Sequence, residues 1–268
     1  MRTADGRIVL GLHRSGHARG LLEAAADLGI GRIDTASNYL RHRSHEVLKR
    51  SAGDLLANFS VSTKVGFFPE GHSLDPARLQ IAVEQVAKDL GREPDLVFLH
   101  NPEHSASDIG RLGPACAALA DTARAGLCGS WGVSTWDPRP LVDLDVPRPD
   151  VLMVRAGLLV GVDVLEAAEA LARRWRPSQV WGMSPFGGST AQEVWARFDP
   201  RVFLQGSASV TKAQAAFHSS YGLPRVDAVA VGTDNVDHLR ELTGALSYEV
   251  DENVVREYRQ LLKARQPA

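Results

Sequence analysis

The chain has 268 residues, near the upper limit of what a single hydrophobic core organises. Its 30 lysines and arginines and 32 aspartates and glutamates give a net charge of −2 without a long run of either sign, which disfavours a nucleic-acid or membrane-surface binder. The apolar fraction of 44% excludes a disordered or collagen-like chain, and two cysteines, Cys116 and Cys128, exclude a disulfide scaffold.

No segment is predicted to cross a membrane or to direct export. Residues 1–7 lack the apolar stretch of a secretory signal, and no run of about 18 apolar residues follows. With so few cysteines, this pattern predicts a soluble protein of a reducing compartment, and we expect a cytoplasmic location.

Short apolar runs rich in β-branched residues recur along the chain. Each leads into a loop and then a helical pattern, which is typical of βα units on a parallel sheet. Eight such runs occur, at residues 8–12, 32–36, 60–66, 96–100, 130–135, 151–155, 179–184 and 228–232.

The clearest helix between these strands begins after Asp75, a capping residue followed by Pro76 at the first helical position. Gly91 ends this helix, and its apolar face is formed by Leu79, Val83, Val86 and Leu90. Further helices are predicted over residues 44–49, 112–123, 165–175, 211–221 and 236–242, and Asp251 is expected to cap a last one.

Eight strands, each followed by a crossover, predict an α/β fold with one (β/α)8 TIM barrel domain over residues 1–268, because such barrels take about 250 residues. An open doubly wound sheet accommodates the same order of elements. That alternative is disfavoured because residues 11–16 read GLHRSG, so the G-x-G-x-x-G fingerprint is absent after the first strand.

Four titratable residues follow three consecutive predicted strands. Asp34 and Tyr39 follow the second, Lys64 closes the third and His100 closes the fourth. In a barrel these carboxyl ends meet at one face, where the Lys64 ammonium would lower the pKa of a neighbouring tyrosine hydroxyl. Asp34 would keep that ammonium charged, and His100 could hydrogen-bond a substrate oxygen. Such a site can protonate a developing alkoxide.

Five segments in chain order resemble motifs of the aldo-keto reductases. Residues 34–39 (DTASNY) resemble the D-T-A-x-x-Y signature, and residues 62–66 (STKVG) resemble the S-T-K-V-G strand end. Residues 99–100 (LH), 131–134 (WGVS) and 211–214 (TKAQ) are similar to the family's L-H, G-V-S and T-x-A-Q segments.

The resemblance implies an oxidoreductase that reduces an aldehyde or ketone to an alcohol by hydride transfer from a nicotinamide cofactor. NADP(H) is the expected cofactor and NAD(H) a possible one. By the same resemblance Tyr39 is the proton donor, Lys64 and Asp34 tune it, and His100 orients the carbonyl.

The family's cofactor positions are matched less completely. Ser134 and Thr135 stand where a Ser-Asn pair holds the nicotinamide carboxamide, and Met153 stands at the usual glutamine. The remaining residues that the resemblance assigns to the cofactor, in the loop after strand seven and the segment after strand eight, are Ser184, Phe186, Gly188, Gly232, Thr233, His238 and Glu241.

The resemblance also indicates an altered floor for the nicotinamide ring. Ala156 and Gly157 replace the family's tyrosine and its neighbour. We expect Trp131 or Trp181 to fill the volume of that tyrosine.

The adenosine 2′-phosphate is expected to be held weakly. His238 stands where the family commonly has arginine or glutamine, and Asp234 and Asp237 oppose a dianion. We therefore expect only a small preference for NADPH over NADH. The alternative is that Lys212 or Arg14 reaches the phosphate across the cleft.

The substrate is expected to meet aromatic residues, Phe67 and Phe68 beyond Lys64 and Trp136 after the fifth strand. His13 and Arg14 either reach the cofactor or an anionic substrate, or form a solvated rim. No metal site is expected, because the remaining histidines near the predicted strand ends lack ligand spacing: His42, His45, His72 and His104.

Two other functions are compatible with this sequence. One is a catalytically silent module that binds the nicotinamide cofactor, and the other is non-redox acid–base chemistry on the same barrel. The expected partner is a small carbonyl compound rather than nucleic acid or membrane, and the oligomeric state stays open.

Overall fold

The computed structural model describes residues 6–206 and 209–264. The prediction that no secretory signal is present rests partly on residues 1–5, which lie outside the described residues. Both ends of the predicted domain, residues 1–268, also lie outside them. Among the described helices, none is both long and apolar enough to span a bilayer.

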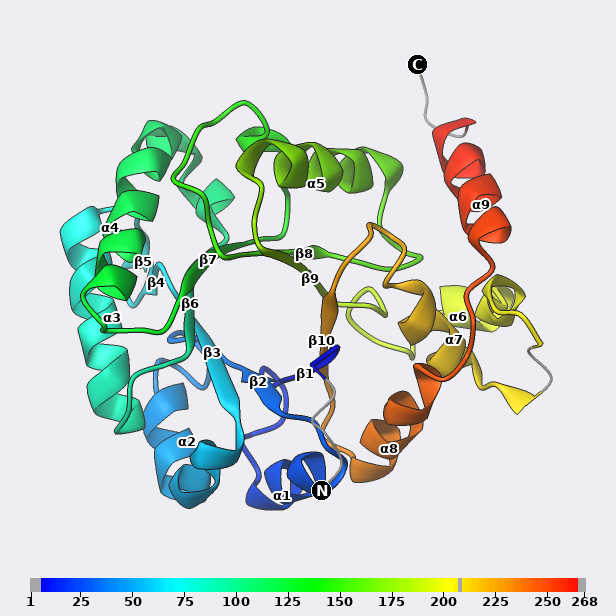
Figure 1. The fold of residues 1–268 in the computed structure, drawn as a ribbon, viewed down its shortest axis with the longest axis horizontal. Helices are drawn as coiled ribbons and strands as arrows, with labels where there is room; N and C mark the ends of the chain where they lie inside the picture. Colours follow the sequence, from blue (N-terminus) through cyan, green and yellow to red (C-terminus); the bar gives the residue numbers. More distant parts are fainter. Residues whose placement is uncertain (1–5, 207–208, 265–268) are drawn as a thin grey trace.

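Eight parallel strands close into a barrel in the order β1-β10-β9-β8-β7-β6-β3-β2 (Figure 1). Closure is made by the first strand, in which Leu10 pairs with Ile33 on one side and Val9 with Ala230 on the other. The predicted barrel is therefore confirmed, and the open doubly wound sheet is excluded. The barrel strands are β1 (Ile8–Gly11), β2 (Arg32–Asp34), β3 (Ser60–Val65), β6 (Leu96–His100), β7 (Trp131–Thr135), β8 (Val151–Arg155), β9 (Gln179–Met183) and β10 (Ala228–Gly232).

Helices surround the strands on the outside of the barrel (Figure 1). They are α1 (Arg19–Asp27), α2 (Ser44–Ala52), α3 (Pro76–Leu90), α4 (Leu112–Arg124), α5 (Val162–Trp175), α6 (Val194–Arg197), α7 (Lys212–Ser219), α8 (Val236–Ala245) and α9 (Glu252–Ala264). The 3-10 segments that lie wholly within the described residues are η1 (Gly53–Asn58), η2 (Pro102–Arg111), η3 (Arg139–Leu141) and η4 (Pro200–Phe203).

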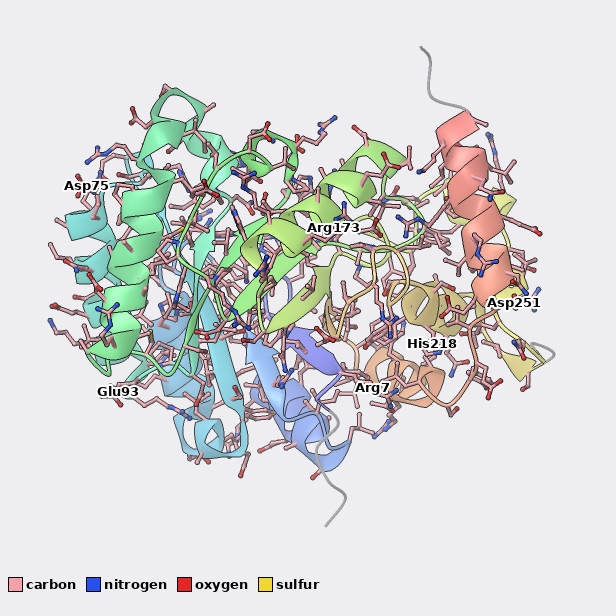
Figure 2. All side chains as sticks on the ribbon, turned by 45° about the horizontal axis from the view of Figure 1, so that its top comes forward. Arg7, Asp75, Glu93, Arg173, His218 and Asp251 are labelled. Carbon is pink, nitrogen blue, oxygen red and sulfur yellow. The ribbon has the colours of Figure 1, made fainter. Side chains whose placement is uncertain are left out.

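The helix predicted between Asp75 and Gly91 is confirmed at both ends. The Asp75 carboxylate accepts from the backbone N–H of Arg78 at 3.0 Å, and Gly91 has a left-handed φ of 74°. Asp251 likewise caps α9, accepting from the N–H of Asn253 at 3.0 Å. Asp75 and Asp251 both lie at the periphery of the molecule (Figure 2).

Three elements lack a strong sequence signal. Helix α1 has no side-chain cap and follows Ala18, so it lacks the usual marker of a helix start. Helix α6 is a single turn between β9 and α7. The loop expected after β3 contains a short antiparallel hairpin, β4 (Phe67–Phe68) and β5 (Gly71–His72), which is too short for periodicity to reveal.

The interior of the barrel is filled by its own cluster of apolar side chains, which includes Val9, Phe98, Met153 and Trp181. The ring of Trp181 meets Phe98 edge-on at 5.8 Å between centroids, and its indole N–H donates to Gln179 at the start of β9. Trp131 is buried in the larger core cluster. The expectation that Trp131 or Trp181 fills the volume of the family's tyrosine is therefore wrong, because neither ring reaches the cavity at the carboxyl ends of the strands.

Candidate active site

A cavity of about 420 Å³ opens at the carboxyl ends of the barrel strands. It is lined by residues from several strand ends and the loops that follow: Gly11, His13, Arg14, Asp34, Asn38, Tyr39, Lys64, Phe67, His100, Asn101, Trp136, Met153, Met183, Ser184, Pro185, Phe186, Gly188, Ala230, Val231 and Gly232. The four titratable residues predicted from the strand ends all belong to this set.

Asp34 and Lys64 form a buried ion pair at the ends of β2 and β3. The lysine also donates to the backbone oxygen of Thr35 at 2.8 Å, and Ser62 donates to the second carboxylate oxygen of Asp34 at 2.9 Å. Burial acts to lower the pKa of Lys64, but the charge of Asp34 and the hydrogen bonds to Asp34 and Tyr39 raise it above its ordinary value. Lys64 is therefore held as a fixed ammonium.

Tyr39 lies beside this ammonium, with the nitrogen of Lys64 5.4 Å from the centre of its ring. Burial raises the pKa of Tyr39 above its ordinary value, and Lys64 opposes that rise by charge and by hydrogen bond. Lys64 thus acts in the predicted direction, but desolvation outweighs it because the phenolate would lose more hydration than one ammonium replaces. The tyrosine stays protonated at neutral pH and available as a proton donor.

His100 closes β6 opposite the tyrosine, with 6.3 Å between the two ring centroids. Burial and the neighbouring charge of Lys64 hold the pKa of His100 well below its usual range, so the imidazole is neutral. Its Nδ1 is buried and has no hydrogen-bond partner among the described residues. A neutral imidazole can donate one hydrogen bond to a substrate oxygen without adding charge.

The opposite wall is made of main chain and apolar side chains. Gly188 (φ 111°) and Gly232 leave backbone exposed to the cavity, and Ser184 has a left-handed φ of 57°. Arg14 reaches across the opening and donates to the carbonyl of Gly188 at 2.7 Å. Phe186 completes this wall. Four predicted cofactor residues of the β9 and β10 ends are thereby brought to one surface.

Ser134 and Thr135 do not line the cavity, although both close β7 as expected. Thr135 donates its hydroxyl to the carboxylate of Glu103 at 3.0 Å. The same carboxylate accepts from the backbone N–H of Trp136 at 2.7 Å and of Asp137 at 3.0 Å. The single proton of the Thr135 hydroxyl is donated to Glu103. It is therefore not available for a nicotinamide carboxamide, which the resemblance assigns to an asparagine at this position.

The floor of the cavity comes from two methionines. Met153 is buried at its predicted place on β8, and Met183 at the end of β9 lies next to it in the apolar cluster of the barrel interior. Ala156 and Gly157, which stand in place of the family's tyrosine and its neighbour, do not line the cavity.

Three predicted residues lie beyond the cavity on the β10 side. Thr233 and His238 approach each other, with 3.5 Å from hydroxyl to Nδ1, and His238 is exposed. Glu241 accepts the hydroxyl of Thr211, the cap of α7. None of these three residues lines the cavity.

Two of the three aromatic residues predicted at the substrate mouth line the cavity. Phe67 and Trp136 line the cavity, and Trp136 is 42% exposed. Phe68 does not line it, because the next residue along β4 points to the other side and packs under the guanidinium of Arg78, 4.1 Å from the ring centre.

Sequence reasoning missed several residues at or beside the site. Met183, Asn38 and Asn101 line the cavity, and Glu103 braces the end of β7. Asn101 directly follows a strand end, and its position there was a usable signal. Glu103 carried none, since its partners are separated from it by more than 30 residues.

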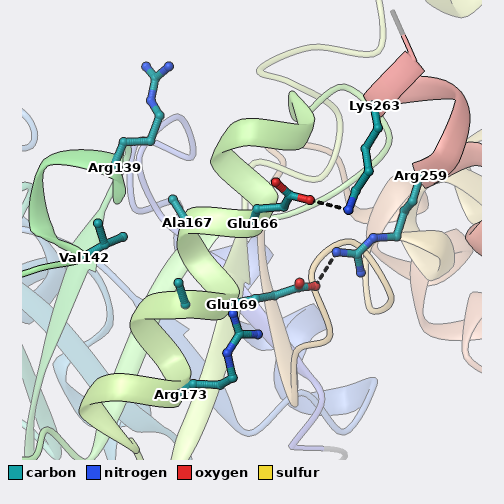
Figure 3. A pocket seen from close by; sticks show the side chains of 9 residues that line it. Arg139, Val142, Glu166, Ala167, Glu169, Arg173, Arg259 and Lys263 are labelled. Atoms are coloured by element: carbon teal, nitrogen blue, oxygen red, sulfur yellow. Dashed lines mark ion pairs between the residues drawn. The ribbon is translucent and has the colours of Figure 1, made fainter. Parts of the chain in front are cut away.

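A second cavity of about 500 Å³ lies between α5 and α9 (Figure 3). Its charged side chains pair across the gap, Glu166 with Lys263 and Glu169 with Arg259. These pairs join two helices and leave the barrel mouth as the better candidate for chemistry. Among the described residues, no group of histidine, cysteine, aspartate or glutamate could hold a metal ion.

Comparisons with known proteins agree with this geometry. The model of the aldo/keto reductase family matches residues 8–172, which is more than half of the chain. The protein therefore belongs to the aldo/keto reductase family, and it is an oxidoreductase by membership. A search of curated proteins finds no match to the chain.

Solved structures share the fold at low sequence identity. A holo-form aldo-keto reductase from Bacillus halodurans has a TM-score of 0.73 and 17% identity over 98% of this chain and 95% of its own. An aldose reductase from Giardia lamblia has a TM-score of 0.73 and 14% identity over 100% of this chain and 95% of its own. A putative aldo-keto reductase from Pseudomonas aeruginosa has a TM-score of 0.63 and 25% identity over 90% of each chain.

Proposed function

We propose that this protein reduces an aldehyde or ketone to an alcohol with a reduced nicotinamide cofactor, and that Tyr39 donates the proton. The observation that carries the proposal is the position of Tyr39 beside the buried Lys64–Asp34 pair in the cavity at the barrel mouth. Neutral His100 across the cavity supplies the second group that a carbonyl oxygen needs.

Each polar residue of the cavity has a separate role in the proposed reduction. As charge develops on the carbonyl oxygen, the Tyr39 hydroxyl transfers its proton to that oxygen, and the fixed ammonium of Lys64 stabilises the phenolate left behind. Asp34 keeps Lys64 charged and oriented. The neutral His100 donates a hydrogen bond that orients the carbonyl. Phe67 and the methionine floor exclude water from the reacting atoms.

The lining of the cavity at the β9 and β10 ends supports the binding of a nicotinamide dinucleotide. Such a cofactor supplies a hydride to the carbonyl carbon when it is bound. Met153 and Met183 offer an apolar floor, and a Cβ at Gly188 would meet one side-chain nitrogen, that of Gln192 at 3.9 Å, so the glycine leaves room for a diphosphate to approach the backbone. Ser184, Phe186 and Gly232 line the same wall. The predicted small preference for NADPH stays part of this proposal.

The test is a titration of the protein with NADPH and NADH, followed by oxidation of the better cofactor with a panel of aldehydes and ketones. Replacing Tyr39 with Phe should leave the cofactor dissociation constant within twofold and lower turnover by ~10²-fold or more, because the general acid is lost. Tyr248→Phe makes the same change away from the cavity and serves as control. Wild-type turnover in the Tyr39→Phe variant contradicts the assignment.

One observation favours a second function, a nicotinamide-binding module without turnover. Thr135, which stands at the family's carboxamide position, donates its hydroxyl to Glu103 and lies outside the cavity. Tight NADPH binding without oxidation by any carbonyl of the panel supports this second function. Failure to bind either nicotinamide supports non-redox acid–base chemistry instead.

A further inference from the structure

The hairpin of β4 and β5 carries a histidine that links three elements at the rim of the cavity. The Nε2 of His72 lies 2.7 Å from the backbone oxygen of His100, at the end of β6. Its Nδ1 lies 2.7 Å from the hydroxyl of Ser105, in η2. His72 does not itself line the cavity, so it can act on the site only through the residues it holds.

The directions of these two hydrogen bonds follow from their partners. A backbone oxygen can only accept, so the proton of the neutral imidazole must be on Nε2, which donates to His100. Nδ1 then accepts, and the hydroxyl of Ser105 must be the donor. Burial lowers the pKa of His72, and the hydrogen bond to His100 opposes this only partly. The imidazole is therefore neutral, with one defined tautomer.

The backbone before the hairpin leaves room for this link. Gly66 has a φ of 129°, and a Cβ at this position would come within 3.1 Å of the His72 Nε2 and 3.5 Å of the His100 oxygen. The carbonyl of Gly66 accepts from the N–H of Ser73 at 2.9 Å, which closes the base of the hairpin. A glycine is needed here both for its conformation and for the space it leaves.

The side chain of His100 depends on what surrounds it. Its Nδ1 has no partner in the described part of the chain, so no hydrogen bond at that atom fixes the ring. Phe67 contacts it edge-on at 4.9 Å between centroids and contacts His72 in the same way at 4.8 Å. The orientation of the His100 ring therefore depends on its backbone and on its ring contacts with Phe67 and, at 6.3 Å, with Tyr39. His72 contacts the backbone oxygen of His100 and the ring of Phe67.

We propose that His72 is a positioning residue, which holds the end of β6 and Phe67 so that the imidazole of His100 faces the carbonyl site. This proposal rests on the function proposed for His100. Nothing in the sequence motifs points to it, because His72 lies in the hairpin that the motifs do not cover. The same link makes Phe67 a fixed wall of the substrate site rather than a mobile loop residue.

Two substitutions separate the two hydrogen bonds of His72. In His72→Gln the terminal amide nitrogen can take the place of Nε2 and still donate to His100. In His72→Asn the shorter side chain can reach Ser105 but loses His100. We expect His72→Asn to lower turnover about tenfold with an unchanged cofactor dissociation constant, and His72→Gln to stay within twofold of the wild type, because small misplacements of an orienting group are costly. His42→Asn, at an exposed histidine, is the control.

A second measurement needs no activity. In the cofactor-free protein labelled with ¹⁵N at histidine, the ring nitrogens of His72 should show the Nε2–H tautomer. The His100 ring signals should shift in His72→Asn and remain near their wild-type positions in His72→Gln. If His100 shifts equally in both variants or in neither, or if His72 shows the other tautomer, the positioning role is wrong. A wild type without turnover overturns the proposed function and leaves this spectroscopic result to decide the link.

Discussion

The two halves of the barrel mouth differ in the groups that line them: one is lined by buried polar side chains and the other largely by backbone. On the β2, β3 and β6 side, Asp34, Lys64 and His100 are buried side chains from neighbouring strands. On the β9, β10 and β1 side, the wall is glycine backbone and loops, closed over by the exposed Arg14. The side proposed to transfer the proton thus depends on the identity of single side chains, and the side proposed to hold the cofactor depends on the path of the main chain.

Polar groups behind the strands reinforce this difference. Thr35 and Thr63, next to Asp34 and Lys64 in sequence, hydrogen-bond outward to Ser44 at 2.5 Å and to His45 at 2.7 Å. His17 adds a further bond to Ser44 at 2.7 Å. Side-chain substitutions on this side should therefore have large effects, whereas those around the cofactor wall should have small ones.

The largest effect is expected for Lys64→Met. Turnover should fall by ~10²-fold or more, because the phenolate of Tyr39 loses its counter-charge. Stability should fall by ~3–5 kcal/mol, because the carboxylate of Asp34 is left buried and unpaired. Urea unfolding and turnover are measured for Lys64→Met and for the double variant with Asp34→Asn. The double variant should regain stability but not turnover, and recovery of both would refute the electrostatic role.

Two buried histidines behind β2 and β3 should make the protein less stable as the pH is lowered. Burial lowers the pKa of both His17 and His45 to about 4, with His17 adding to the effect on His45. Between pH 6.5 and about 4 the unfolded chain binds protons that the folded one does not, so the free energy of unfolding falls as pH is lowered. The slope is on the order of 1 kcal/mol per pH unit for each histidine.

Unfolding by urea at pH 7 and pH 5 measures this slope. His45→Gln keeps a polar partner for Thr63 but cannot titrate, so its stability should depend less on pH. His42→Gln, at an exposed histidine, should keep the wild-type slope. Equal slopes in the wild type and His45→Gln contradict the assignment to His45.

A smaller effect is expected at the border between the two halves. Glu103→Ala removes the acceptor for Thr135 and for two backbone N–H groups, which should cost ~1–3 kcal/mol of stability. Glu103→Gln keeps one carbonyl oxygen and should cost less. Thermal unfolding measures both variants against Glu84→Ala on the exposed side of α3. A loss in Glu84→Ala as large as in Glu103→Ala shows that the brace contributes nothing specific.

The smallest effect concerns the choice of cofactor. The preference for NADPH over NADH should stay within about tenfold, roughly 1.4 kcal/mol. Arg240, which is close to His238 in sequence, is paired with Asp237 at 2.7 Å. Lys212, which we considered as a cation that could reach the 2′-phosphate, donates to the backbone oxygen of Trp195 at 3.2 Å. Both cations therefore already have partners other than a phosphate. Dissociation constants for both cofactors at pH 6 and pH 8 decide this. A preference above about a hundredfold that does not change with pH contradicts both the weak grip and the role of His238.

The sequence predicted more of the arrangement on the β2, β3 and β6 side of the barrel mouth than on the opposite side. Asp34, Lys64 and His100 were predicted correctly as neighbours because each ends a strand, and strand ends of a closed parallel barrel meet at one face. Ser134 and Thr135 were placed on the right strand end, but the hydrogen-bond partner of Thr135, Glu103, comes from a different segment. Periodicity carries no information about such a pairing.

The sequence by itself determined the number and order of the barrel strands, the ends of α3 and the gathering of Asp34, Tyr39, Lys64 and His100, because these follow from local patterns and the geometry of a closed sheet. Only the tertiary structure decided that burial outweighs Lys64 in setting the pKa of Tyr39, that methionines form the cavity floor, and that the hairpin histidine links to His100. Desolvation and contacts between distant segments depend on which atoms surround a group in space, and a linear pattern does not specify those atoms.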